Sequence, residues 1–437
     1  MARGRKLSLL EAVSMAVGTM IGASIFSIFG VGARIAGTNL PEAFVLSGLF
    51  ALLVAYSYAR LGARIVSNAG PIAFILRGIG DNLVSGALAV LMWLSYVVSI
   101  ALFAKGFAGY LLPLVHVKAS AAGMRTVEVL VVGFFTALNF FGSKAVGRAE
   151  LYIVLVKLSI LGVFIGLGFM TIRPESVVPA VDPRHLKGTL NASVIFFLSY
   201  MGFGLVTNAS EHMERPERNV PLAIFISIAV VMAVYVGVSL VAVGNLSIAQ
   251  LVRAGDNALA VAAEPFLGRF GFVLISVGAL FSISSALNAT LYGGANIAYS
   301  LAKDGELPAV FERKVWFKST EGLYITSGLA LAFALLMNLS EIASLTSAVF
   351  TVIYIFVLVS HYRLAGEYGG NRAFLVFGTA VLAAVFGALM LYQWQTQRAS
   401  FYAVLVTFGG ALVVEYLLRH VGKGRRLAGD RRREARD

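Results

Sequence analysis

The stretch Gly18-Thr19-Met20-Ile21-Gly22-Ala23-Ser24 lies in the middle of the first hydrophobic segment, where a membrane helix would otherwise be continuous. The sixth hydrophobic segment contains a second such stretch, Tyr200-Met201-Gly202-Phe203-Gly204. An unpaired backbone N–H or C=O in hydrocarbon costs several kcal/mol, so a broken helix persists only where it lines a polar cavity or meets a ligand. One break is equally compatible with a kink, because glycine is common in membrane helices. Two breaks that lie five spans apart favour the central binding site of a transporter.

The composition is that of a protein embedded in a lipid bilayer. The chain has 437 residues, of which 59% are hydrophobic and only 13% are charged, and its mean hydropathy is +0.84. Soluble domains carry about 25% charged residues. We therefore expect an all-α membrane protein with twelve transmembrane helices, each long enough to cross about 30 Å of hydrocarbon. The expected spans are 8–34, 41–66, 84–114, 125–141, 149–171, 190–211, 220–244, 269–301, 323–338, 342–363, 373–394 and 399–418.

Lysine and arginine residues are distributed unevenly between the loops. If the N-terminus lies inside, 24 of the 35 lie on the cytoplasmic side and 9 on the outer side, while Lys105 and Lys157 lie within spans. This bias follows the positive-inside rule and predicts a multi-pass protein of the cell (plasma) membrane with both termini in the cytoplasm. The basic tail at 421–437 is expected to contact anionic lipids. The net charge of +13 therefore implies no nucleic-acid partner.

The spacing of the two breaks also predicts an internal repeat. An odd number of spans in each unit inverts the second unit in the membrane, which is the architecture of many secondary transporters. We expect one transporter domain over 1–437, with a first repeat at 7–171, an inverted second repeat at 190–365, and two further helices at 372–420. The polar segment 245–268 is expected to form a short helical loop over the outer mouth.

Lys157 is the charged residue that lies deepest in an apolar span. It follows Arg148 at the inner boundary by nine residues, which is about 13 Å along a helix. Its stem could snorkel toward the interface, but a lysine at this depth marks a proton or substrate path by default. Removal from water favours the neutral amine over the ammonium, so Lys157 could bind and release a proton. Lys105, near the outer end of the third span, is expected to reach the interface.

Three stretches resemble signatures of the amino acid–polyamine–organocation transporter superfamily. Residues 18–26 are similar to its glycine-rich first-helix motif, 211–221 to its acidic, Pro-basic, Asn-Val-Pro loop after helix six, and 302–308 to its Arg-Asp-Gly-x-Leu-Pro loop after helix eight. The resemblance extends along nearly the whole chain and is strongest to archaeal proton-coupled members of broad amino acid specificity. It implies a LeuT-type fold of five plus five inverted helices, in which helices 1 and 6 are discontinuous.

The resemblance assigns the substrate to the two breaks. Backbone N–H groups at the start of the half-helix after the first break would bind the carboxylate of an amino acid, and carbonyls of both breaks would accept from its ammonium. The expected substrate-binding residues are Ile21, Gly22, Ala23, Ser24, Tyr200, Gly202 and Phe203. Phe203 would form a gate or a wall, or it would simply pack in an apolar helix. Many relatives carry an acid where this chain has Gly204, and its absence favours neutral amino acids.

The resemblance also assigns proton coupling to Lys157. Its ammonium would occupy the place of the cation in sodium-coupled relatives, with the Gly18 carbonyl and the hydroxyls of Ser282 and Ser285 as neighbours. The two serines share a helix face at i, i+3, a pattern that small-residue packing also explains. The implied function is sodium-independent, proton-coupled secondary transport of L-amino acids by alternating access.

Two other interpretations remain open. An exchanger would move amino acids without net proton movement, and a channel or a membrane sensor would need a pore loop, a selectivity ring or a soluble output domain. The sequence shows none of these three features. It also contains no cysteine, no phosphate-binding loop, no zinc spacing and no nucleophile elbow, so we expect no enzyme activity, no metal and no cofactor.

Overall fold

The computed structural model describes residues 6–22, 24–67, 70–118, 120–139, 146–303, 307–313 and 321–421. All of the regular elements in this part of the chain are helices. Eleven of them, taken by length and composition, could cross a membrane. The expected span 323–338 forms a shorter apolar helix, α14 (Glu321–Leu336). An all-α protein with many apolar spans is therefore confirmed, with eleven candidate spans instead of the expected twelve.

The first half of the chain contains α1 to α8. The bounds are α1 Leu9–Met20, α2 Ser24–Ser27, α3 Phe29–Ala36, α4 Leu40–Gly62, α5 Pro71–Ile79, α6 Leu83–Leu114, α7 Ala121–Asn139 and α8 Val146–Phe169. The start of α1 is fixed by a capping box, in which the Glu11 backbone N–H donates to Ser8 Oγ and the Ser8 backbone N–H donates to the Glu11 carboxylate. Such a box satisfies N–H groups that have no partner inside the helix.

The second half contains α9 to α17 and a long 3-10 helix. The bounds are α9 Pro183–Phe196, the 3-10 helix η3 Phe197–Gly204, α10 Leu205–Asn208, α11 Pro216–Asn245, α12 Ile248–Ala254, the 3-10 turn η5 Gly255–Asn257, α13 Ala258–Lys303, α14, α15 Leu339–Tyr368, α16 Arg372–Thr396 and α17 Arg398–Val421. Shorter 3-10 turns are η1 Gly37–Asn39, η2 Pro174–Val177, η4 Ser210–His212 and η6 Ala309–Glu312. The expected helical loop at 245–268 is present as α12, η5 and the start of α13, which turns at Gly268 with φ 57°.

Both α-helices that the sequence marked as interrupted are interrupted. At the first break α1 ends at Met20, and the Gly22 N–H donates to the carbonyl of Thr19, three residues back. Ala23 lies outside the described residues. The second interruption takes a different form from the first, because residues 197–204 continue as a 3-10 helix, which joins α9 to α10.

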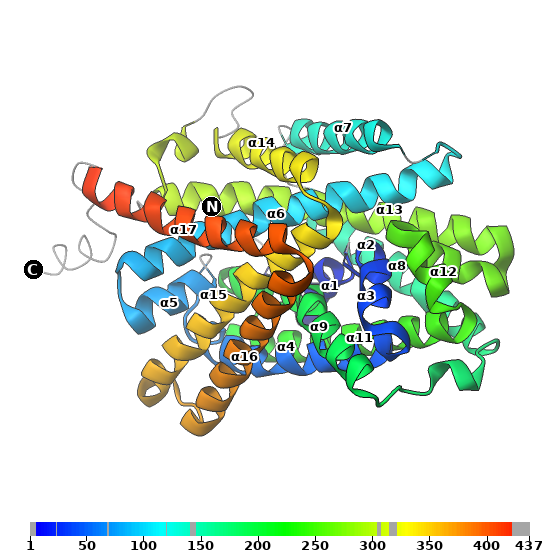
Figure 1. The fold of residues 1–437 in the computed structure, drawn as a ribbon. Coiled ribbons are helices and arrows are strands. Elements are labelled where there is room, and N and C mark those ends of the chain that lie inside the picture. Colours follow the sequence, from blue (N-terminus) through cyan, green and yellow to red (C-terminus); the bar gives the residue numbers. More distant parts are fainter. Residues whose placement is uncertain are drawn as a thin grey trace, which may run out of the picture.

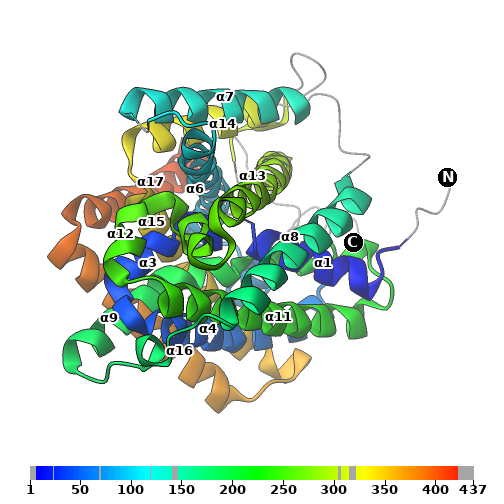
Figure 2. The same cartoon turned by 90° about the vertical axis from the view of Figure 1, so that its right-hand side faces the viewer.

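The long helices α4, α6, α11 and α13 run roughly along one direction of the molecule, and α15 and α16 cross it obliquely (Figure 1). α5 lies near one end and α12 at the other. Figure 2 looks from the α12 end and shows α7 at the periphery of the bundle. α1 lies inside it, in contact with α8, α11, α13 and η3. This placement surrounds the first break with protein from helices that are distant in sequence.

Candidate functional site

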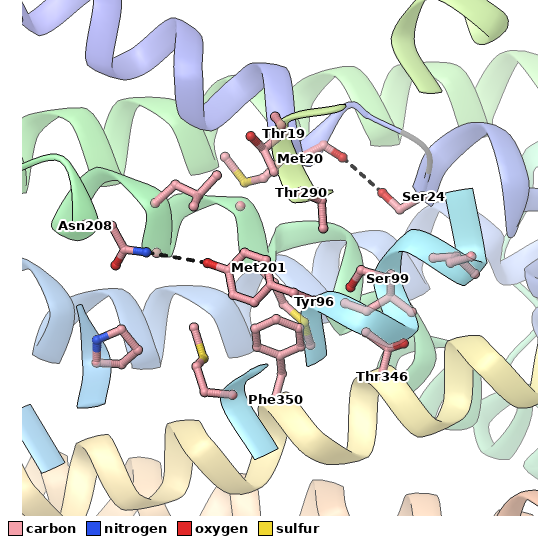
Figure 3. Close-up of a pocket in the computed structure, with 18 of the residues that line it drawn as sticks. Thr19, Met20, Ser24, Tyr96, Ser99, Met201, Asn208, Thr290, Thr346 and Phe350 are labelled. Carbon is pink, nitrogen blue, oxygen red and sulfur yellow. Dashed lines mark hydrogen bonds between the residues drawn. The ribbon is translucent and has the colours of Figure 1, made fainter. Parts of the chain in front are cut away.

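A cavity of about 90 Å³ lies between the two interruptions and α6, α13 and α15 (Figure 3). One buried water needs roughly 10–15 Å³, so the cavity has room for several waters or one small solute. Its walls come from α1, α2, α4, α6, η3, α10, α13 and α15, together with the start of α5. The lining residues are Thr19, Met20, Ser24, Tyr58, Pro71, Met92, Tyr96, Ser99, Leu102, Phe103, Leu198, Met201, Gly202, Gly204, Leu205, Asn208, Ala289, Thr290, Thr346, Phe350 and Tyr354.

The two interruptions touch each other at Gly202. A Cβ atom on this residue would lie 2.8 Å from the backbone nitrogen of Met20 and 3.0 Å from Thr19 Cβ. Real side chains do not approach a backbone atom this closely, so only glycine allows η3 to pack against the first break. The cavity is therefore bounded by the main chain of both interruptions.

Side chains from α8 and α13 hold carbonyl groups of the first break. Lys157 Nζ of α8 donates to the Gly18 carbonyl at 2.6 Å. Ser282 Oγ of α13 lies 2.5 Å from the Ile21 carbonyl and 2.9 Å from that of Gly22. These contacts provide the partners that an interrupted helix needs away from water. They also bring Gly18, Lys157 and Ser282 of the expected coupling set to one place.

Lys157 is almost completely buried, with 1% of its surface exposed. It belongs to the middle of α8 and reaches the first break across the α1–α8 contact. Ser285, the fourth residue of the expected coupling set, lies on α13 three residues beyond Ser282 and is partly buried. A buried ammonium is stable only when protein groups replace its hydration, and the Gly18 carbonyl is one such group.

Tyr235 of α11 is a component that the sequence analysis missed. Its hydroxyl lies 2.5 Å from the Met20 carbonyl, 3.1 Å from the Ser199 carbonyl and 3.3 Å from Ser24 Oγ. A hydroxyl has one proton, so it donates to one of the two carbonyls at a time. Tyr235 therefore links the first break to η3. The available signal was a lone phenol in an otherwise apolar stretch of α11, since buried hydroxyls usually have a partner.

Only some of the expected substrate-binding residues line the cavity. Ser24 and Gly202 line the cavity. Ile21 and Gly22 are buried beside it, held by Ser282 of α13. Ala23 lies outside the described residues.

The two expected aromatic residues lie behind the cavity wall. The Tyr200 hydroxyl donates to the Phe44 carbonyl at 2.9 Å. Phe203 is fully buried, and its ring centroid lies 5.2 Å from that of Tyr58 and 5.8 Å from that of Tyr354, both of which line the cavity. Phe203 thus supports the wall from outside.

The described lining of the cavity is polar in places but has no charged side chain. Four of its hydroxyl groups donate to carbonyls of the preceding turn, and Asn208 Nδ2 lies 3.5 Å from the Tyr96 hydroxyl (Figure 3). The four are Thr19, Ser24, Ser99 and Thr346. None of the described lining residues is Asp, Glu, Lys, Arg or His. An ion without a partner in such a cavity would bear a large desolvation cost, so the site suits a solute without net charge.

The sequence is similar to known membrane transport proteins. It matches the family described as amino acid permease over residues 7–412. It is 65% identical over 421 residues to an uncharacterized protein of Methanocaldococcus jannaschii, covering 96% of this chain and 97% of that protein. It is 32% identical over 422 residues to the inner membrane transport protein YbaT of Escherichia coli, covering 96% of each. It is 30% identical over 380 residues to the methylthioribose transporter of Bacillus subtilis, covering 81% of each.

Proposed function

The chain belongs to the amino acid permease family, within the amino acid–polyamine–organocation superfamily, and we propose that it imports neutral L-amino acids together with protons. Membership in this family makes it a membrane transporter of amino acids and not an enzyme. Beyond this membership we propose three features, which are coupling to protons, a preference for neutral substrates and transport by alternating access.

The proposed architecture is a twelve-helix LeuT-type fold in the plasma membrane with cytoplasmic termini. α14 would be the twelfth span, although it is only 16 residues long. The five-span distance between the interruptions supports an inverted repeat, and the excess of lysine and arginine on one side supports the orientation. In this orientation α12 and η5 lie on the outer side, and α5 lies on the cytoplasmic side.

The proposed substrate site is the cavity between the interruptions. Ser24 begins the helical run after the first break, so its neighbourhood would receive the carboxylate of the amino acid. Gly202 lines the opposite side of the cavity, where η3 packs against the first break. The side chain would face Met92, Met201 and Phe350, which together with the uncharged lining supports a neutral, small or apolar amino acid.

The observation that carries the proton proposal is the contact of the buried Lys157 Nζ with the Gly18 carbonyl at 2.6 Å. A protonated Lys157 donates a charge-assisted hydrogen bond to the break, and this bond weakens when the proton leaves. Gain or loss of one proton would therefore change how firmly α8 holds α1. Since α1 forms one wall of the cavity, this couples the proton to the substrate site without sodium.

A Lys157→Ala variant tests this proposal in proteoliposomes. We expect amino acid uptake driven by an inward proton gradient to be lost, because the variant has no group at 157 that carries the proton. Lys187→Ala, which removes an exposed lysine whose partner is Gln395, is the matched control and should transport normally. Uptake by the Lys157→Ala protein with undiminished dependence on the gradient would refute the proposal, as would a strict sodium requirement. Counterflow without any proton dependence would identify an exchanger instead.

A further inference from the structure

A group of charged side chains lies between the cavity and the α12 end of the molecule. Lys105 of α6 does not simply reach the interface, as its position in the sequence suggested, because its Nζ donates to Glu128 Oε1 of α7 at 3.2 Å. The Lys105 side chain is 15% exposed and that of Glu128 only 1%. Buried charges interact strongly because little water screens them. A change in the charge of Lys105 or Glu128 therefore changes its electrostatic interaction with the neighbouring charged groups.

Asp256 of η5 is a second carboxylate close to the same ammonium. η5 follows α12 and contacts α2, α3 and α6. Asp256 Cβ lies 2.6 Å from the place that a Cβ on Gly109 would occupy, one turn of α6 beyond Lys105. Asp256 interacts electrostatically with both Lys105 and Glu128. It forms no ion pair within 4 Å in the part of the chain that the structure describes. Lys105 therefore pairs with Glu128, while Asp256 packs against the same helix without an ion pair among the described residues.

The Glu128 carboxylate is itself incompletely satisfied. Its second oxygen, Oε2, is buried and has no hydrogen-bond partner among the described residues. A buried charged oxygen without a partner is costly, and a proton on the carboxylate removes that cost. The other charged or titratable groups that face this pair of carboxylates are Arg125 of α7, Arg34 of α3 and Tyr110 of α6. Both arginines are exposed, and the Tyr110 hydroxyl donates to the Phe26 carbonyl.

We propose that Glu128 is a second proton-binding site, and that its proton determines whether Lys105 pairs with Glu128 or with Asp256. When Glu128 is ionised, it holds Lys105, as in this structure. When a proton binds to the Glu128 carboxylate, Asp256 becomes the stronger partner for the ammonium. The new ion pair then ties η5, and α12 with it, more firmly to α6.

This inference rests on the proposed function, which places α12 and η5 on the outer side and supplies protons from there. In a proton-driven importer the outer side must close after proton and substrate have entered. A proton on Glu128 would strengthen that closure. Lys157 would carry the coupling proton at the first break, while Glu128 would report the external pH to α12 and η5.

The experiment measures how often α12 lifts away from the bundle. The chain has no cysteine, so one introduced cysteine reacts alone. Leu251→Cys places a thiol at the buried position of α12, where a membrane-impermeant maleimide reacts only when the segment lifts. Arg253→Cys, exposed on the same helix, measures how the thiol reaction itself depends on pH. The readout is the ratio of the two labelling rates in the purified full-length protein at mildly acidic and mildly alkaline pH.

We expect this ratio to be about fivefold lower at acidic pH, the lower end of typical couplings between two sites. Glu128→Gln, which mimics the protonated acid, should keep the ratio low at both pH values. Asp256→Asn should keep the ratio high at both pH values. This variant alters only η5, so it still tests the proposal if the Glu128→Gln protein does not fold. Glu264→Gln is the matched control, because Glu264 is an exposed carboxylate near the start of α13. This variant should behave like the wild-type chain.

A ratio that is independent of pH in the wild-type chain, or a Glu128→Gln protein that responds like the wild type, would overturn the proposal. The labelling needs no transport, so its result is separate from that of the uptake assay. The expected labelling pattern without proton-driven uptake would leave the Glu128 site standing and reject the proposed function. Proton-driven uptake without the expected labelling pattern would reject only the Glu128 site.

Discussion

Gly202 shows how a single residue sets the geometry of this site. Its missing side chain lets η3 lie against the backbone of Met20, while Tyr235 joins the same two segments through its hydroxyl. The main chain of both interruptions thereby faces one cavity. At this scale the sequence pointed to Gly202, which lines the cavity, whereas nothing in the apolar stretch around Tyr235 showed which groups its hydroxyl would meet.

A Gly202→Ala substitution should strongly reduce transport. The added methyl group would lie within about 3 Å of the Met20 backbone, and relief of such overpacking costs about 1–3 kcal/mol and shifts the backbone. We expect at least a tenfold loss of uptake and a lower unfolding temperature in detergent. Gly166→Ala, at a position of α8 with open space around it, should leave both quantities unchanged. Wild-type uptake by the Gly202→Ala protein would show that the close approach is not needed.

Among the elements, α17 is attached to the start of α6 by charged groups. Arg419 Nε donates to Glu415 Oε1 at 2.5 Å, and the same guanidinium pairs with Asp81 and donates to the Asn82 carbonyl at 3.1 Å. Glu415 is fully buried against Gly86 of α6. Most of α17 faces outward, so these contacts add to its packing against α6, α15 and α16.

An Arg419→Met substitution should therefore weaken the attachment of α17. It removes a guanidinium from the buried Glu415, and hydrogen bonds to charged groups contribute about 1.5–3 kcal/mol. We expect a lower unfolding temperature in detergent, with little change in uptake by the folded protein, because the cluster is remote from the cavity. Arg363→Met, which removes an exposed arginine of α15, is the control. Equal unfolding temperatures for the two variants would contradict this role of Arg419.

For the whole molecule, the helices form a cavity whose described lining has hydroxyl, amide and apolar groups but no Asp, Glu, Lys, Arg or His. Desolvation of a charged side chain in such a site is not compensated. The net charge of the substrate side chain should therefore decide acceptance before its size does.

A competition panel in proteoliposomes tests this expectation. Unlabelled alanine, serine or leucine should reduce the uptake of a labelled neutral amino acid at least tenfold more effectively than arginine, lysine or glutamate at equal concentration, since an uncompensated charge costs several kcal/mol. The panel includes methylthioribose, after which one relative is named. Its competition shows whether a substrate needs the amino acid backbone in addition to a neutral side chain. Effective competition by arginine or glutamate would place the true substrate site elsewhere.

The sequence by itself determined the apolar spans, the two interruptions and the depth of Lys157. Hydropathy and the need for backbone hydrogen bonds in lipid act within one segment, so a segment reveals them without its neighbours. Only the tertiary structure decided which side chains meet, as for Tyr235 with Met20, 215 residues away, or Lys105 with Glu128. In a membrane protein the lipid-facing and the buried faces of a helix are both apolar, so hydropathy does not show which face turns inward. Packing of small residues and hydrogen bonding between helices make that choice.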